Sequence, residues 1–262
     1  SSPTPTPTAS SSSTEIKIAA AGDIACDPDD AGFDGSSATR CHMKATSDVL
    51  LANNYAAILT LGDHQYNSGT SSEFAASYDP TWGRVKSITH PTAGNHEYGM
   101  QEGRGYYDYF GSAAGPRDQG YYSFDLGDWH LIALNSNCED VGCSEGSAQF
   151  EWLEDDLADS DAECTLAYWH HPRFSSGHDG DATFMADMWN KLYDAGAEVV
   201  LAGLGSRSPS SPPGRSWSGR SVGRGDWVPL GVPLGRAWIR LFGIIPIDYD
   251  HLSIASTWCS VW

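Results

Sequence analysis

Several apolar segments of this chain end in the same way, with polar side chains directly after the last apolar residue. Segments 15–23 and 56–63 end in Gly-Asp, segment 87–97 ends in Gly-Asn-His-Glu, and segment 164–174 carries Trp-His-His-Pro. Short apolar runs bounded by turn residues predict β-strands. Because ligands of α/β sheets bind beyond the carboxyl ends of the strands, these strand ends predict one shared site.

Segments with helical spacing separate these strands. Residues 41–54, 147–160 and 182–196 place apolar side chains on one face, which is typical of amphipathic helices. Segment 121–136 has the alternation and central Gly-Asp of a β-hairpin, and 197–203 reads as a last buried strand. Strands that alternate with helices predict an α/β fold, to which the hairpin adds an antiparallel element.

The composition excludes some functions and indicates a location. The 262 residues carry a net charge of −19, which argues against a nucleic-acid-binding surface or an anionic-membrane surface. No apolar run reaches the roughly 18–20 residues of a membrane-spanning helix. Residues 1–14 form a Ser/Thr/Pro tract that reads as an extended linker, so we expect a secreted or cell-wall-associated protein. The sequence does not determine the oligomeric state.

The six cysteines are compatible with secretion. Cys26 and Cys41 flank a loop rich in Gly, Asp and Ser, and Cys138 and Cys143 flank four residues. Either pair can form a local disulfide in an oxidising compartment, and buried free thiols are the alternative. Cys164 and Cys259 have no obvious partners. The connectivity of disulfides cannot be deduced from sequence alone.

The polar residues after the strands form a set of metal-ligand types. Taken singly, Asp23 and Asp63 read as turn residues, and a lone histidine after a strand is more often hydrogen-bonded structure. Taken together, carboxylate, amide, imidazole and phenolate groups are ligands for Fe, Zn or Mn. One carboxylate can bridge two ions about 4 Å apart, the arrangement of two-metal phosphoryl hydrolysis.

The motifs GDIA, GDHQY, GNHE and WHHP resemble those of the calcineurin-like metallophosphoesterases. Gly-Asp-x-x-Tyr resembles the purple acid phosphatase branch in particular, and the resemblance covers about residues 16–203. Only GDIA departs from the usual motif of the family, which more often has Gly where Ala25 stands. The implied fold over 15–203 is a layered sandwich of mixed β-sheets flanked by helices, with its C-terminal part incomplete.

The resemblance also implies a role for each ligand. Asp23 and Tyr66 would bind the first metal, Asp63 would bridge both, and Asn95 and His170 would bind the second. The two divalent or trivalent ions would be Fe with Fe, Zn or Mn.

Three further residues receive roles outside the metal ligands. His96 would be catalytic, orienting the phosphate or protonating the leaving oxygen. Glu97 would lie behind the ligands and hold His96. His170 is preferred to His171 as the ligand because of the family's His-x-Pro spacing, so His171 would lie beside the ligands.

The tail at 204–262 departs from this pattern. The family's last strand is followed by Gly-His-x-His, but no such motif follows 197–203. Residues 1–202 contain nine basic and 31 acidic residues, whereas 203–262 contain six arginines and three acids. We therefore predict a frameshift near codon 204. A divergent C-terminal strand pair and a separate basic arm are the alternatives. Without the motif each metal would lose one ligand.

The sequence thus predicts a secreted metal-dependent hydrolase of phosphate monoesters, of acid phosphatase type, that acts on a small phosphorylated substrate. A phosphodiesterase or nucleotidase with the same site is the first alternative. A catalytically inactive remnant that binds phosphate or a partner is the second. No feature identifies the leaving group, although Tyr106, Tyr107, Tyr109 and Phe110 could line a pocket wall.

Overall fold

A computed structural model describes residues 16–35, 37, 40–99, 102–175 and 180–203, with the backbones of two further strands at 237–243 and 253–259. The predicted linker at 1–14 lies outside the described residues, as does most of the tail at 204–262.

The strands form two sheets. Their bounds are β1 (Ile16–Ala21), β2 (Ala57–Leu61), β3 (Thr89–Thr92), β4 (Tyr122–Leu126), β5 (Trp129–Ala133), β6 (Cys164–Trp169), β7 (Val199–Ala202), β8 (Ala237–Gly243) and β9 (Ser253–Cys259). The first sheet has the order β3-β2-β1-β8-β9 and the second has the order β4-β5-β6-β7. Only β9 and β4 run antiparallel to their neighbours. The carboxyl ends of β1, β2 and β3 therefore lie at one end of the first sheet.

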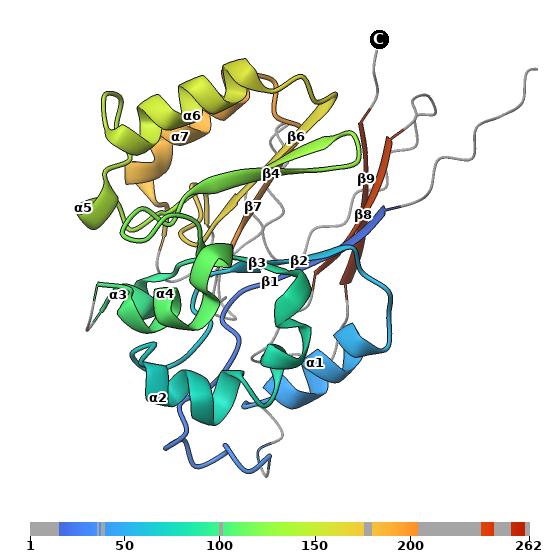
Figure 1. The fold of residues 1–262 in the computed structure, drawn as a ribbon, viewed down its shortest axis with the longest axis vertical. Helices are drawn as coiled ribbons and strands as arrows, with labels where there is room; N and C mark the ends of the chain where they lie inside the picture. Colours follow the sequence, from blue (N-terminus) through green and yellow to red (C-terminus); the bar gives the residue numbers. More distant parts are fainter. Residues whose placement is uncertain are drawn as a thin grey trace, which may run out of the picture.

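Helices cover the outer faces of both sheets, as Figure 1 shows. The α-helices are α1 (Met43–Leu51), α2 (Ser71–Glu73), α3 (Asn95–Tyr98), α4 (Arg104–Phe110), α5 (Cys138–Val141), α6 (Ala148–Asp159) and α7 (Ala186–Asp194). Short 3-10 and π segments complete the set, namely η1 (Phe74–Tyr78), η2 (Trp82–Ile88), η3 (Gly111–Ala114) and η4 (Thr183–Met185). Helices α1 to α4 lie on the side of the first sheet, and α6 and α7 lie on the side of the second.

Strand alternation builds three apolar layers. Ile18 of β1 packs between the two sheets with Leu131 and Leu166. The next residue, Ala19, faces the helices instead and packs with Leu50 of α1. Since successive side chains of a strand point to opposite faces, this alternation buries both faces of each sheet.

The outer strand β3 is held by tyrosine hydroxyls. The Pro91 carbonyl oxygen accepts the hydroxyl of Tyr106 at 3.0 Å and that of Tyr122 at 2.9 Å. The hydroxyl of Tyr168 donates to the His90 carbonyl at 3.3 Å. These bonds fix β3 between α4 and the second sheet.

Several predictions about local structure are confirmed. The hairpin of β4 and β5, both disulfides (Cys26–Cys41 and Cys138–Cys143) and the three long helices are present. The segment 87–97 is not extended throughout, because α3 begins at Asn95. Glu97 caps this short helix by accepting the Gly94 N–H at 2.8 Å, which favours a helical turn there.

The described part of the chain contains no helix of the length and apolarity that crossing a membrane requires.

Candidate metal centre

The loops after β1 and β2 bring two carboxylates and a phenol together. The Tyr66 hydroxyl donates to Asp23 Oδ1 at 2.7 Å and lies 3.1 Å from Asp63 Oδ2. Both aspartates have positive φ, 57° for Asp23 and 47° for Asp63. This left-handed backbone is uncommon outside glycine, and residues held in it cluster at functional sites.

His170 approaches the same carboxylate from the second sheet. It follows β6 directly and is fully buried. Its Nε2 lies 3.1 Å from Asn95 Oδ1 and 3.4 Å from Asp63 Oδ2. Its Nδ1 lies 2.8 Å from the Leu61 carbonyl oxygen. Because a carbonyl only accepts, Nδ1 carries a hydrogen, and Nε2 is the nitrogen that the neutral ring can offer to a cation.

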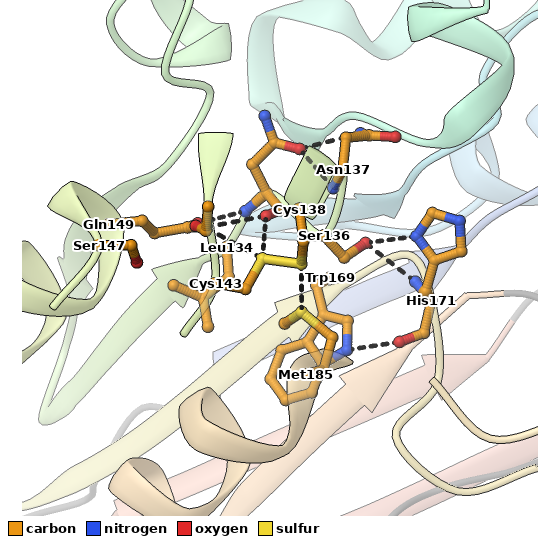
Figure 2. Close-up of a disulfide and its surroundings, with 12 residues drawn as sticks. Leu134, Ser136, Asn137, Cys138, Cys143, Ser147, Gln149, Trp169, His171 and Met185 are labelled. Atoms are coloured by element: carbon orange, nitrogen blue, oxygen red, sulfur yellow. Dashed lines mark hydrogen bonds between the residues drawn. A yellow bond between two sulfur atoms is a disulfide. The ribbon is translucent and has the colours of Figure 1, made fainter. Parts of the chain in front are cut away.

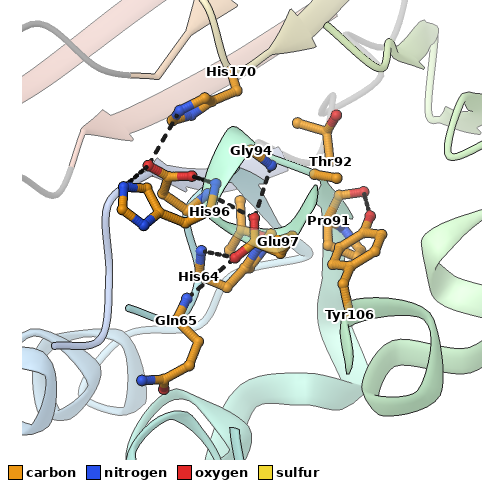
Figure 3. A network of polar contacts seen from close by, with 12 residues as sticks. His64, Gln65, Pro91, Thr92, Gly94, His96, Glu97, Tyr106 and His170 are labelled. Atoms are coloured by element: carbon orange, nitrogen blue, oxygen red, sulfur yellow. Dashed lines mark hydrogen bonds and ion pairs between the residues drawn. The ribbon is translucent and has the colours of Figure 1, made fainter. Parts of the chain in front are cut away.

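Glu97 ties two of these loops together from behind (Figure 3). Its carboxylate is 1% exposed and accepts four backbone N–H groups. The donors belong to Asp63, His64, Gln65 and Gly94, at 3.0, 2.8, 3.3 and 2.8 Å. The residues after β2 are thereby fixed to the residue before Asn95. Nδ1 of His64 also lies 3.5 Å from Glu97 Oε2, and the expected role of Glu97 toward His96 stays a prediction.

Two glycines permit the close packing of these loops. A Cβ on Gly94 would collide with the backbone nitrogen and the carboxylate of Asp63. Gly62 has φ of +83°, and a Cβ there would lie 2.7 Å from the His170 ring. The Gly of the GDHQY and GNHE motifs is therefore required because neighbouring residues approach its Cα closely, and at Gly62 also because of the positive φ.

His96 occupies the more exposed side of the cluster. Its backbone N–H donates to Asp63 Oδ1 at 3.0 Å, and its ring Nδ1 lies 2.5 Å from the Asn67 carbonyl oxygen. Its Nε2 is 3.9 Å from Asp63 Oδ2, and 30% of the side chain is exposed. The ring packs edge-on against Tyr66, with 4.4 Å between centroids. His96 thus combines proximity to the carboxylates with access to solvent.

His171 is held by a serine after β5. Its Nδ1 lies 2.8 Å from Ser136 Oγ, which also accepts the His171 backbone N–H at 3.1 Å (Figure 2). Ser136 follows β5 and precedes the Cys138–Cys143 disulfide. The structure therefore places His170 among the predicted ligands and His171 beside them.

Charge is strongly coupled within the cluster. Burial alone would raise the pKa of Asp63, but the adjacent His170 ring lowers it below its usual range. Burial alone would lower the pKa of His170, but the Asp63 carboxylate raises it. Burial, followed by the charges of Asp23 and Asp63, raises the pKa of Tyr66.

Comparisons with known proteins identify the family of this chain. A model of the calcineurin-like phosphoesterase family matches residues 16–203. The chain belongs to this family. Purple acid phosphatase 15 of Arabidopsis thaliana is 30% identical in an alignment of 195 positions that covers 60% of this chain and 36% of that protein. Purple acid phosphatase 23 of the same plant is 26% identical in an alignment of 214 positions that covers 67% of this chain and 46% of that protein.

A solved structure shares the fold. Purple acid phosphatase PPD1 from yellow lupin (Lupinus luteus) seeds superposes with a TM-score of 0.57 at 16% identity, covering 71% of this chain and 37% of that one. The two helix-flanked sheets are thus a metallophosphoesterase fold. The chain spans less than half the length of these relatives.

Several side chains of this calcineurin-like phosphoesterase domain are of the types that bind a cation. Ligand atoms about 2.0–2.2 Å from one ion lie roughly 3 Å from each other. The separations of 2.7 Å (Tyr66 to Asp23), 3.1 Å (His170 to Asn95) and 3.4 Å (His170 to Asp63) are of this size. Within the described residues, no group of three or more His, Cys, Asp or Glu side chains is arranged to hold a metal ion. Tyr66 and Asn95 supply donors of other types.

Some residues of the site had no assigned role in the sequence analysis. Ser136 was not singled out, although it follows the apolar strand β5 and the same rule about strand ends would have found it. Of the α4 residues suggested for a pocket wall, Tyr106 and Tyr107 are buried in the core, whereas Phe110 lines a cleft away from the candidate metal centre. Phe110 is also buried, at 4% exposure.

Proposed function

We propose that this chain is a secreted metal-dependent phosphoesterase that hydrolyses phosphate monoesters. The observation that carries the proposal is the convergence of Asp23, Asp63, Tyr66, Asn95 and His170 in a member of the calcineurin-like phosphoesterase family. These residues come from loops after four strands of two sheets, so only the folded chain brings them together.

The donor set divides into two groups that share Asp63. Tyr66, which also contacts Asp23, lies 3.1 Å from Asp63 Oδ2, and His170, which also contacts Asn95, lies 3.4 Å from the same oxygen. Asp63 would bridge two ions, of which the Tyr66 side suits Fe and the other suits Fe, Zn or Mn. Two such cations supply the positive charge that an anionic ester requires and lower the pKa of a bound water.

His96 is the proposed catalytic side chain. It is the partly exposed histidine beside the carboxylates, and its Nδ1 is held by the Asn67 carbonyl oxygen at 2.5 Å. Because a carbonyl only accepts, Nδ1 carries a hydrogen, and Nε2 faces Asp63 at 3.9 Å. A histidine in this position can orient the phosphate or give a proton to the leaving oxygen.

The experiment combines metal analysis with two substrates. Purified protein is analysed for bound metals by mass spectrometry, and hydrolysis of 4-nitrophenyl phosphate is compared with that of bis(4-nitrophenyl) phosphate. We expect Asp63→Asn to lower the rate at least 100-fold, whereas Asp155→Asn on exposed α6 leaves it unchanged. Faster hydrolysis of the diester would favour the phosphodiesterase alternative. A protein with two bound metals and no hydrolysis of either ester would contradict the proposal.

The composition of the tail supports a second proposal, that the reading frame changes near codon 204. If the sequence as given is correct, the missing Gly-His-x-His motif favours the inactive remnant as the alternative function, since each metal would lack one ligand. Sequencing the gene through codons 195–262 tests this. A corrected frame that gives Gly-His-x-His after β7 would support the frameshift. If the printed frame is verified, the frameshift is wrong, and we expect weak metal binding.

The disulfides support the location proposed here. Cys26–Cys41 and Cys138–Cys143 are expected to persist in an oxidising compartment such as the cell exterior or wall. Detection of the protein in the extracellular fraction of the source cells would test this, and confinement to the cytosol would contradict it.

A further inference from the structure

A cleft lies away from the candidate metal centre, at the amino end of β3. Its volume is about 720 Å³, within the range of sites for small molecules. It is lined by η2, the start of β3, the end of α4 with η3, and β4. Since β3 and β4 are the outer strands of their sheets, the cleft lies where the outer strands of the two sheets meet. None of the candidate metal ligands lines it.

One wall of the cleft is aromatic and preformed. The rings of His90 and Phe124 stack across the two sheets, with 3.8 Å between centroids and 13° between planes. The neighbouring Tyr122 hydroxyl already donates to the Pro91 carbonyl. Burial lowers the pKa of His90, so its ring is neutral at neutral pH. A planar apolar group can therefore lie against this wall without displacing a hydrogen bond.

Basic side chains also line the cleft. Lys86 and Arg84 line the cleft, and no Asp or Glu does, although the chain has 34 acidic and only 15 basic residues. Arg84 is neutralised by Asp48 at 2.7 Å. Among the described residues Lys86 has no carboxylate partner; its Nζ donates to the Tyr109 carbonyl at 2.5 Å and lies 4.1 Å from the Tyr109 ring centroid. An ammonium has three donors, so Lys86 retains donors for an anion.

We propose that this cleft binds a small planar aromatic molecule that carries one anionic group. The ring of the ligand lies against His90 and Phe124, and its anionic group accepts from Lys86. The hydroxyls of Ser87 and Ser112 line the same cleft and make no hydrogen bond with the described residues, so they can also bind the anionic group. This site is independent of the proposed metal chemistry.

The test uses a matched pair of probes, 2-naphthoate and its neutral analogue 2-naphthamide. Binding of each is measured by calorimetry, and the His90 ring signals are followed by NMR in the unmodified protein. We expect 2-naphthoate to bind more tightly than 2-naphthamide and to shift the His90 signals. Lys86→Met should weaken 2-naphthoate about tenfold and abolish the preference for the anion.

Two further variants locate the effect. Lys191→Met removes a lysine of α7 that pairs with Glu154 of α6, outside the cleft, and should leave both affinities unchanged. Phe124→Leu keeps an apolar side chain but removes the stacking ring, so both probes should bind more weakly. Equal binding of the two probes to the unmodified protein would overturn the proposal. So would the absence of binding at millimolar probe, unshifted His90 signals, or a preference for the anion that survives Lys86→Met.

Discussion

The Glu97 side chain holds the backbone of Asp63, which lies 34 residues earlier in the chain. Oε2 of Glu97 lies 3.0 Å from the Asp63 nitrogen and 2.8 Å from the Gly94 nitrogen. One buried carboxylate thus connects the loop that carries the proposed bridging ligand to the loop that carries Asn95. The distance between the Asp63 and Asn95 side chains therefore depends on Glu97, which binds the backbone of these loops.

Replacing Glu97 should therefore disturb stability and metal binding together. Glu97→Gln leaves one oxygen and places an NH₂ donor against backbone donors, so buried N–H groups lose their acceptor. We expect the free energy of unfolding to fall by about 2 kcal/mol, measured by urea denaturation. Metal affinity should fall about 10–100-fold. Glu151→Gln, on the exposed face of α6, is the control. A cost no larger than that of the control would contradict this role.

A methyl group on Gly94 should act on the same contact by collision. The added Cβ of Gly94→Ala would meet the Asp63 backbone and carboxylate, so the two loops must separate. Overpacking of this kind costs about 1–3 kcal/mol. Gly99→Ala is a matched control, because its Cβ would meet no atom closer than 3.5 Å. Thermal unfolding of both variants measures the difference, and equal melting temperatures would rule out the collision.

His130 should make stability depend on pH. Its two ring nitrogens lie 2.8 Å from Asp125 Oδ1 and 2.9 Å from Asp156 Oδ2. The hydrogen bond to Asp156, opposed by burial and assisted by Asp125, raises the pKa of His130. The folded protein therefore binds this proton more tightly than the unfolded chain. The stabilisation is fully present below the unfolded pKa of about 6.5 and is lost as pH rises through the higher folded pKa.

Urea denaturation of the unmodified protein and of His130→Gln between pH 6 and pH 9 measures this effect. We expect a difference on the order of 1 kcal/mol at pH 6 that shrinks toward pH 9. A difference that stays constant, or grows with pH, would show that the His130 proton does not stabilise the fold.

The Cys26–Cys41 and Cys138–Cys143 disulfides should differ in their contributions to stability. Cys26 and Cys41 are 15 residues apart, whereas Cys138 and Cys143 are five apart. Loop-closure entropy gives about 3 kcal/mol for the first and about 2 kcal/mol for the second. The double variants Cys26→Ser/Cys41→Ser and Cys138→Ser/Cys143→Ser, each denatured in urea, compare them. The reverse order would mean that native contacts, rather than unfolded-chain entropy, determine the difference.

The residues predicted from sequence were those whose position follows from one rule. Asp23, Asp63 and Asn95 follow parallel strands of one sheet, whose carboxyl ends must lie together, and His170 follows a strand of the other sheet. The short-range disulfides were also predictable, because five or fifteen residues of loop keep two cysteines close. The site roles that sequence proposed for these residues remain predictions until metal binding is measured.

Other features leave no such pattern. Glu97 binds backbone N–H groups, which every non-proline residue has, so the sequence does not reveal its partners. Residues 71–88 fold as short α, π and 3-10 turns, which lack the 3.6-residue periodicity of a long helix. The cleft beside His90 depends on how two sheets pack at their outer strands, and only the assembled fold shows it.

The hydrogen bonds from tyrosine hydroxyls to β3 should reduce aggregation of the protein at high concentration. An outer strand with free N–H and C=O groups is a template for pairing with another chain, which leads to aggregation. Pro91 in the middle of β3 has no N–H, and its carbonyl already accepts two hydroxyls, from Tyr106 and Tyr122. Pro91 therefore offers an incoming strand neither a donor nor a free acceptor. The bonds that fix β3 in the sandwich also protect this side of the protein from intermolecular β-sheet growth.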